Sequence, residues 1–268
     1  MKVVIIGCGW LGQQLAADLI MQGHQVYGSR RSVSALVHFP VGITGFLLDL
    51  NSAASDKDSI MPILHNAVVI CAITPGRDQR QQHYITALQQ LAGLATVAGS
   101  RQLIHFSSTG IYQGLHGEVD ETAPLQMAEP RVSLLWQGEQ ALQQFQPALT
   151  LRLAGLMGPG RHPGRFTAGK ELPDATAPIN MLHSADIIAA VKLLLGATPC
   201  SGVFNLSCPL TVKRQDFYQQ AAVSAGKTPA IFANDSGEGR KVNAEKFVRQ
   251  FNFSYRFAAA SDALAYCD

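Results

Sequence analysis

A glycine-rich segment near the start of the chain has spacing that could bind phosphate. Gly7-Cys8-Gly9-Trp10-Leu11-Gly12 is a G-x-G-x-x-G sequence, and it follows an apolar run at residues 3–6. Glycines so spaced allow a tight turn, close backbone approach to a pyrophosphate and close packing of the next helix. The start of that helix attracts anions. The segment predicts a dinucleotide site, with a ligand-free glycine turn as the alternative; its residues would be Gly7, Gly9, Trp10, Leu11 and Gly12.

Two arginines stand at the position that recognises the ribose 2′-hydroxyl or 2′-phosphate in dinucleotide sites. An NAD site carries an acidic residue roughly 20 residues beyond the glycines, where it binds the ribose 2′-hydroxyl. This sequence has Ser29-Arg30-Arg31 there and no acid. Guanidinium groups match a 2′-phosphate in charge and geometry. NADP(H) is therefore favoured over NAD, and a solvated surface pair is the alternative.

Strand-like and helix-like segments alternate through the first two thirds of the chain, and they are the elements that must position these residues. The expected strands are short apolar runs, typical of strands buried in a parallel sheet; they lie at residues 3–6, 24–28, 45–48, 67–73, 103–106 and 148–153. Helical spacing lies between them, most clearly over residues 80–98. This alternation predicts an α/β fold, a Rossmann-type doubly wound parallel sheet.

The amino-acid composition of the chain changes after residue 155. Residues 158–178 are rich in Gly and Pro and are expected to be loop. A helix at residues 186–195 and a strand at 203–206 follow, and the remainder reads as helical pieces with a polar loop at 234–239. We expect a Rossmann core of residues 1–153, which the segment around 180–206 rejoins. Residues 154–179 and 207–268 would form a small C-terminal substrate-side lobe.

Composition narrows the classes of partner. The net charge of +2 gives no footprint for nucleic acid or an anionic membrane, and no apolar stretch reaches membrane length. The five cysteines are scattered without CxxC spacing, which favours free thiols in a reducing cytoplasm. No cluster has metal-ligand spacing. We expect a cytoplasmic monomer or homodimer with a small-molecule substrate.

Four further segments resemble motifs of the extended short-chain dehydrogenase/reductase family, which includes nucleotide-sugar epimerases and dehydratases. The family patterns are SSTxVYG, DExxP, LRxxxxYGPGR and IHVDDxA. Their counterparts are Phe106-Ser107-Ser108-Thr109-Gly110-Ile111-Tyr112, Val119-Asp120-Glu121 with Pro124, Leu151-Arg152 with Gly158-Pro159-Gly160-Arg161, and Leu182-His183-Ser184-Ala185-Asp186-Ile187. The match extends over almost the whole chain and is closest to atypical members labelled epimerase/dehydratase-like or YeeZ-like.

The resemblance implies roles for several residues. Thr109 would donate its hydroxyl to a substrate carbonyl, and Ser107 would lie at the cofactor. Asp49, followed by Leu50, resembles the acid that contacts the adenine after the third strand. Tyr112 is either a packing residue or a substitute proton donor. His183 and Asp186 would chiefly anchor a helix.

The chain departs from the family at its catalytic pair. Glu139 matches the acidic residue that follows the catalytic Lys on the same helix in the family. Counting back from Glu139 places Leu135 at the position of the catalytic Lys and Arg131 at the position of the catalytic Tyr. No Tyr-x-x-x-Lys spacing occurs in the chain. Neither replacement can perform the proton transfer of a neutral Tyr.

A second departure concerns the substrate cover. Only eighteen residues separate Arg161 from Asn180, where sugar-nucleotide enzymes carry a longer lid. We therefore expect an NADP(H)-binding oxidoreductase or epimerase/dehydratase-like protein, acting on a small polar substrate with a non-standard proton donor. The alternative is a catalytically silent NADP(H)-binding sensor or interaction protein.

Overall fold

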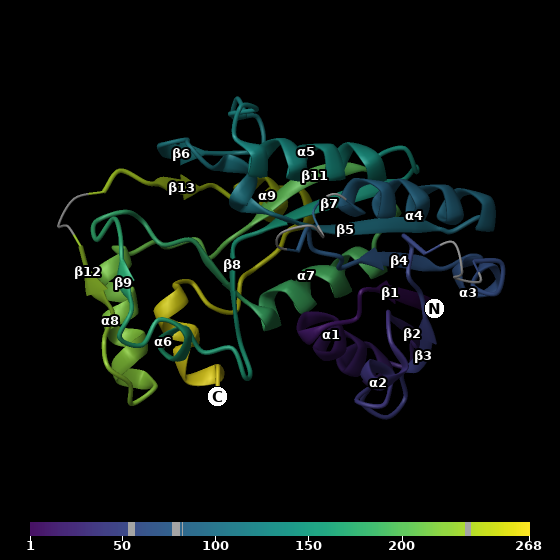
Figure 1. The fold of residues 1–268 in the computed structure, drawn as a ribbon, viewed down its shortest axis with the longest axis horizontal. Helices are drawn as coiled ribbons and strands as arrows, with labels where there is room; N and C mark the ends of the chain where they lie inside the picture. Colours follow the sequence, from purple (N-terminus) through teal and green to yellow (C-terminus); the bar gives the residue numbers. More distant parts are fainter. Residues whose placement is uncertain (53–56, 77–80, 82, 234–236) are drawn as a thin grey trace. The chain divides into compact units, whose positions relative to one another are not determined.

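The computed structural model describes residues 1–52, 57–76, 81, 83–233 and 237–268 (Figure 1). The first part of the chain alternates strands and helices: β1 (Lys2–Ile6), α1 (Trp10–Met21), β2 (Gln25–Arg30), α2 (Val33–Leu36), β3 (Thr44–Leu47), α3 (Met61–Leu64), β4 (Val68–Cys71), α4 (Tyr84–Ala98), β5 (Gln102–Ser108), the 3-10 helix η2 (Thr109–Tyr112), β6 (Gly117–Val119), α5 (Pro130–Leu142) and β7 (Ala148–Leu153).

Shorter elements follow: β8 (Gly155–Met157), α6 (Pro163–Phe166), β9 (Glu171–Leu172), β10 (Met181–His183), α7 (Ser184–Gly196), β11 (Gly202–Leu206), α8 (Arg214–Ser224), β12 (Ile231–Phe232), β13 (Arg240–Val242), α9 (Glu245–Phe251) and η3 (Ala260–Tyr266). Two predictions fall partly outside the described residues. They are the start of the α4 helix at Arg80 and the first part of the loop expected at 234–239.

A seven-stranded parallel sheet organises the fold, in the order β11-β7-β5-β4-β1-β2-β3. Val4 of the central strand β1 is in register with Tyr27 of β2 and Val69 of β4. The chain order reverses beside β1, because β2 and β3 lie on one side and β4 and β5 on the other. This is the order of a Rossmann sheet, and ligands bind such sheets beyond the carboxyl ends of the strands at the reversal. The predicted α/β Rossmann fold is confirmed.

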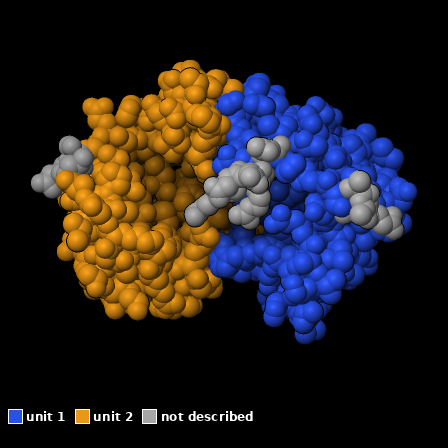
Figure 2. All heavy atoms as spheres, viewed as in Figure 1, with its two compact units in different colours: residues 1–108, 133–151, 191–203 blue, residues 109–132, 152–190, 204–268 orange. Residues whose placement is uncertain are grey.

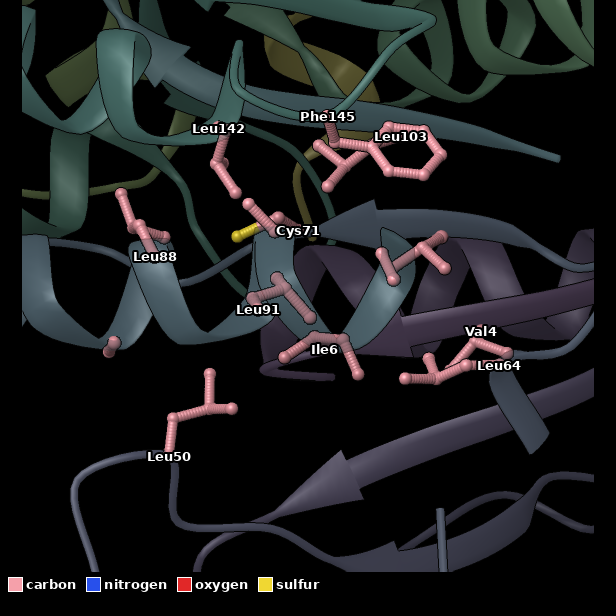
Figure 3. Close-up of a cluster of buried hydrophobic side chains, with 14 of the residues drawn as sticks. Val4, Ile6, Leu50, Leu64, Cys71, Leu88, Leu91, Leu103, Leu142 and Phe145 are labelled. Atoms are coloured by element: carbon pink, nitrogen blue, oxygen red, sulfur yellow. The ribbon is translucent and has the colours of Figure 1, made fainter. Parts of the chain in front are cut away.

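Both faces of the sheet are buried, which explains the continuous apolar strands. Successive side chains of a strand point to opposite faces. Val4 and Ile6 of β1 face Leu64 of α3 and Leu91 of α4 in a hydrophobic cluster (Figure 3). Ile5 points the other way, towards α1, where its Cγ2 lies 3.1 Å from the place of a Cβ on Gly12.

The chain forms two compact units (Figure 2). Unit 1 contains residues 1–108, 133–151 and 191–203, and unit 2 contains 109–132, 152–190 and 204–268. The division expected from the sequence kept residues 109–132 with the first unit, whereas here they belong to the second. Unit 1 therefore holds the glycine turn and the arginines, and unit 2 holds Thr109 and Tyr112.

Unit 2 is built from short strand pairs and helices around a second apolar cluster. The pairs are β10 with β8, β12 with β9, and β13 with β6. Helix α6 approaches α8 so closely that a Cβ on Gly164 would overlap the backbone oxygen of Ala221. The expectation that residues 158–178 are all loop is wrong, because α6 and β9 lie there. These elements are too short to show a periodic pattern, and contacts distant in sequence hold them.

Candidate functional site

The glycine turn of unit 1 is fastened to the end of β2. Gly7 has a φ of +79°, a conformation that favours glycine, and a Cβ there would lie 3.3 Å from the Ala72 carbonyl. The Gly7 N–H donates to Ser29 Oγ at 2.9 Å, and the Cys8 N–H donates to the Ser29 carbonyl at 3.1 Å. Ser29 is buried. Ser29 therefore holds the glycine turn in its observed conformation.

The other two glycines of the turn differ in their surroundings. A Cβ on Gly12 would lie 3.1 Å from Ile5 Cγ2 and 3.3 Å from Cys8 Sγ, so glycine lets α1 pack closely on β1. A Cβ on Gly9 would meet only Gly7 O at 3.7 Å and Arg30 Nη1 at 4.0 Å. Gly9 thus leaves space beside the turn, and a guanidinium lies at the edge of that space.

Arg30, the last residue of β2, and Arg31, which follows it, are held differently. The guanidinium of Arg30 lies over the Phe39 ring, 5.3 Å from its centroid. Its Nε is buried and has no hydrogen-bond partner among the described residues. Arg31 is exposed. A cation whose position is fixed and a second, freely accessible one suit an anionic ligand with several oxygens.

Cys8 is a packing residue of the turn. Burial raises the pKa of its thiol to about 11, although Arg30 acts in the opposite direction. The thiol is therefore neutral near pH 7, and a redox role for it is disfavoured. All five cysteines are free.

The remaining residues predicted at the cofactor also lie in unit 1. Trp10 is half-buried and Leu11 is buried, both in the first turn of α1. Asp49 is half-buried just after β3, and its Oδ1 accepts from the Asn51 N–H at 3.0 Å. Leu50 belongs to the hydrophobic cluster (Figure 3).

A buried polar group lies at the end of β5. Ser107 Oγ donates to Glu139 Oε1 at 2.6 Å, which explains how the Glu139 carboxyl can lie in the interior of unit 1. His105 Nε2 is 3.5 Å from the Tyr84 hydroxyl. Burial lowers the pKa of His105 to about 4, with Glu139 acting in the opposite direction. His105 is thus a neutral core histidine.

Thr109 begins unit 2 directly after β5. It is buried, and its carbonyl accepts a hydrogen bond from Arg240 Nη2 at 3.3 Å. No hydrogen bond among the described residues uses its hydroxyl. In the part of the chain that the structure describes, the observed hydrogen bond of Thr109 is therefore made by its backbone.

The Tyr112 hydroxyl is fully engaged inside unit 2. It accepts from Arg152 Nη1 at 2.8 Å and donates to Asn205 Oδ1 at 2.9 Å. The side chain is completely buried. Burial raises the pKa of Tyr112 despite the neighbouring Arg152. These contacts favour the packing interpretation of Tyr112 over proton donation.

His183 and Asp186 anchor the start of α7, as the resemblance implied. His183 Nδ1 accepts from the Ala185 N–H at 3.1 Å, and its Nε2 bonds the Tyr266 carbonyl at 3.2 Å. Asp186 Oδ1 accepts from the Arg256 N–H at 2.6 Å. Both side chains hold backbone groups of the C-terminal segment.

Arg240 is the residue at this site that the sequence did not reveal. It lies on β13, and its contact with Thr109 joins residues 131 positions apart. A single arginine in a three-residue strand carries no local signal of that contact. Burial lowers the pKa of Arg240, and repulsion from Arg131 acts in the same direction.

Two absences are observed in the part of the chain that the structure describes. No three His, Cys, Asp or Glu side chains come together there as a metal-binding group would. No helix there combines the length and apolarity needed to cross a bilayer.

The fold is that of the epimerases and dehydratases of the extended short-chain dehydrogenase/reductase family. Similar solved structures include MoeE5 in complex with UDP-glucose and NAD (19% identity, TM-score 0.80, covering 100% of this chain and 97% of that one). Another is UDP-glucuronic acid 4-epimerase from Bacillus cereus in complex with NAD (17% identity, TM-score 0.80, covering 99% and 97%).

The sequence comparison is more specific. No model of a protein family matches the chain. Protein YeeZ of Escherichia coli K12 is 34% identical over 265 residues, which cover 96% of each chain. The chain belongs to the YeeZ family.

Proposed function

We propose that this protein binds NADP(H) and is an oxidoreductase or epimerase/dehydratase-like enzyme for a small polar substrate. The observation that carries the proposal is the open face of Gly9 with Arg30 Nη1 at its edge. The space fits a pyrophosphate and the guanidinium fits a further phosphate. MoeE5 and the Bacillus cereus epimerase, which share the fold, are described in complex with NAD.

Each residue of the turn has a distinct part in this proposal. The backbone from Gly7 to Gly12, including Trp10 and Leu11, would bind the pyrophosphate. Arg30 and Arg31 would bind the 2′-phosphate, while Ser29 holds the turn to which they are attached. Asp49 and Leu50 would lie at the adenine. Ser107, fixed by Glu139, would border the cofactor.

The cofactor, when bound, supplies a nicotinamide that can take or give a hydride. The chain's own contribution is made by Thr109, whose hydroxyl would polarise a substrate carbonyl. The proton donor is non-standard. Tyr112 would have to give up its hydrogen bond to Asn205 in order to donate, so a bound water is favoured in this role.

The proposed substrate is smaller than a sugar nucleotide. Only eighteen residues lie between Arg161 and Asn180, and the described part of this stretch contains one short helix and one two-residue strand. Such a segment offers little cover for a bulky ligand. The free cysteines fit a reducing compartment, and we propose that this is the cytoplasm.

Calorimetric titration of the purified protein with NADPH and with NADH tests the proposal. NADPH should bind, and more tightly than NADH. Equal affinities would overturn the preference for NADP(H), and the absence of binding by either would overturn the whole proposal. A screen of small carbonyl compounds with NADPH then tests for turnover, which is measured as the loss of absorbance of the reduced nicotinamide.

A catalytically silent NADP(H)-binding protein is the second candidate. Leu135, at the position of the family's catalytic Lys, is buried. A buried leucine cannot assist proton transfer. This candidate predicts tight NADPH binding with no turnover of any carbonyl compound in the screen, whereas the enzyme requires at least one substrate whose reduction depends on Thr109.

A further inference from the structure

A cavity of about 280 Å³ lies within unit 1, at the amino edge of the central sheet. Its lining consists of Met1, Lys2, His65, Asn66, Val68 and Arg101. Lys2 and Val68 are the first residues of β1 and β4, and Arg101 directly precedes β5. Because these three strands are neighbours in the sheet, the cavity lies where their amino ends meet.

This edge of the sheet is opposite to the edge that carries the glycine turn. The turn starts at Gly7, directly after the last residue of β1, whereas Lys2 is the first residue of that strand. A strand rises about 3.3 Å per residue, so the two positions are roughly 16 Å apart. A ligand in the cavity would therefore be distinct from the proposed dinucleotide.

Lys2 carries a positive charge whose position at the cavity is fixed. Its Nζ donates to the carbonyls of Pro62 and His65, at 2.8 Å each. These bonds hold the ammonium group beside His65, a second residue of the lining. An ammonium group has three donors, so one of them remains for a ligand.

The nearby carbonyl groups at the end of α4 are bonded by other groups of the protein. His65 Nδ1 lies 2.8 Å from the Ala98 carbonyl oxygen, and the Asn66 N–H donates to the Gly99 carbonyl at 3.1 Å. These carbonyl oxygens therefore have their own donors and leave the side chains of Asn66 and Arg101 available.

Arg101 brings a second positive charge to the cavity. Its N–H donates to the Ala67 carbonyl at 2.8 Å, which fixes its backbone beside β4. Within the described residues, neither the guanidinium of Arg101 nor the side-chain amide of Asn66 has a hydrogen bond or an ion pair. No Asp or Glu belongs to the lining. The cavity thus combines two cations and an amide donor without a counter-ion.

We propose that this cavity binds a small anion, a phosphate or a carboxylate group, at Lys2, Asn66 and Arg101. Positive charge without a counter-ion attracts anions. Ammonium, guanidinium and amide groups all donate to the oxygens of phosphate and carboxylate. The volume is at the lower end of the range for ligand pockets, so the ligand is a small one. This inference adds a second ligand site and does not depend on the proposed function.

Calorimetric titration with inorganic phosphate and with malonate tests the inference. The protein carries Arg30→Ala and Arg31→Ala, so that these arginines of the proposed dinucleotide site cannot bind the probes. At least one probe should bind saturably, and the tighter of the two identifies the group as phosphate or carboxylate. Arg101→Gln should weaken that binding by about tenfold or more, because one charge-assisted contact is lost.

Asn66→Gly provides a second, independent variant. Asn66 has a φ of +53°, a left-handed conformation that glycine adopts without strain. The change therefore removes the side-chain amide and keeps the backbone as it is. Binding of the probe should weaken by about threefold or more, since a neutral hydrogen bond contributes less than a charge-assisted one.

The matched control is Arg249→Gln, which removes the charge of an exposed arginine outside the cavity whose partner is Glu245. It should leave binding of the probe unchanged. An equal loss in this control, or no saturable binding of either probe, would overturn the inference. Binding that both Arg101→Gln and Asn66→Gly leave unchanged would overturn it as well, because the anion would then be bound elsewhere. NADPH titration of the unmodified protein decides the proposed function separately.

Discussion

Arg30 Nη1 lies 4.0 Å from the place where a Cβ on Gly9 would stand. The first residue is a cation at the end of β2, and the second is the middle glycine of the turn after β1. Parallel pairing of β1 with β2 brings them together. Phosphate binding by the turn and phosphate binding by the arginine are therefore parts of one arrangement, and each can be tested separately.

Removal of both arginines should abolish the preference for NADPH. In Arg30→Ala combined with Arg31→Ala, the affinity for NADPH should fall about tenfold or more, because each charge-assisted hydrogen bond contributes about 1.5–3 kcal/mol. The affinity for NADH, which lacks the 2′-phosphate, should change little. Fluorescence titration of both nucleotides measures the ratio.

The control for charge combines Arg101→Ala with Arg249→Ala, since both arginines are exposed. It should leave the ratio of affinities unchanged. A double Arg30 and Arg31 variant that still prefers NADPH would show that these residues do not read the 2′-phosphate.

Gly9→Val should abolish dinucleotide binding without unfolding the protein. The Cβ would have room, with its nearest neighbour Gly7 O at 3.7 Å, but the side chain would occupy the space proposed for the pyrophosphate. NADPH titration and the thermal midpoint together measure this. Gly93→Val is the control, because nothing lies within 4 Å of a Cβ on Gly93 in α4. Normal NADPH binding by the Gly9 variant would make the turn purely structural.

Thr109→Val keeps the shape of the side chain and removes the hydroxyl. With a substrate found by the screen, kcat should fall by about 100-fold or more, the effect of losing one polarising hydrogen bond. NADPH affinity should be unaffected. An unchanged rate would remove Thr109 from the mechanism. Turnover of UDP- and dTDP-sugars by the unmodified protein should be weak or absent, and brisk turnover would overturn the small-substrate proposal.

Tyr112→Phe should reduce stability, because it leaves buried groups of Arg152 and Asn205 without their shared partner. The free energy of unfolding should fall by about 1–3 kcal/mol, measured by urea denaturation. Tyr266→Phe, at a half-exposed position, should have little effect. A Tyr112→Phe variant of normal stability but without turnover would instead make Tyr112 the proton donor.

His105 should make the stability depend on pH. Its pKa in the folded protein is about 4, against 6.5 for an ordinary histidine. Between these values the unfolded chain binds a proton that the folded protein does not. The contribution of neutral His105 to the free energy of unfolding is therefore complete above pH 6.5. As the pH falls from 6.5 towards 4, the free energy of unfolding decreases by up to about 1.4 kcal/mol per pH unit.

Urea denaturation between these pH values should show a shallower dependence for His105→Gln than for the unmodified protein. His38→Gln, at an exposed position, serves as the control and should follow the unmodified protein. Identical slopes for the His105 variant and the unmodified protein would contradict the assignment.

The sequence predicts the elements whose pattern is local. Strand β7 was expected at residues 148–153 and is found as Ala148–Leu153, because an apolar run between a proline and a glycine is legible in the sequence alone. Glu139, by contrast, is a charged residue that is buried. Its partner Ser107 is 32 residues away, and helical spacing does not reveal such a partner.

The site could be predicted only in part, because sequence patterns reveal residues at a fixed spacing but not contacts between residues far apart in the chain. The glycine turn and Ser29-Arg30-Arg31 are recognisable because a fixed spacing joins them. Arg240 can be assigned to the site only from its contact with Thr109, which lies 131 residues away in the sequence. Its role depends on the pairing of β13 with β6, two three-residue strands that no periodicity marks.

The burial of Leu135 has a consequence for what single mutations of this chain can achieve. Leu135 lies on α5 and is 1% exposed. A lysine restored there by one mutation would place an ammonium group among apolar atoms, at a cost of several kcal/mol. Placing a Tyr-x-x-x-Lys pair at residues 131 and 135 would thus require the neighbouring packing to change first, so variants of this chain are more easily selected for new uses of the proposed nucleotide site than for chemistry that needs that pair.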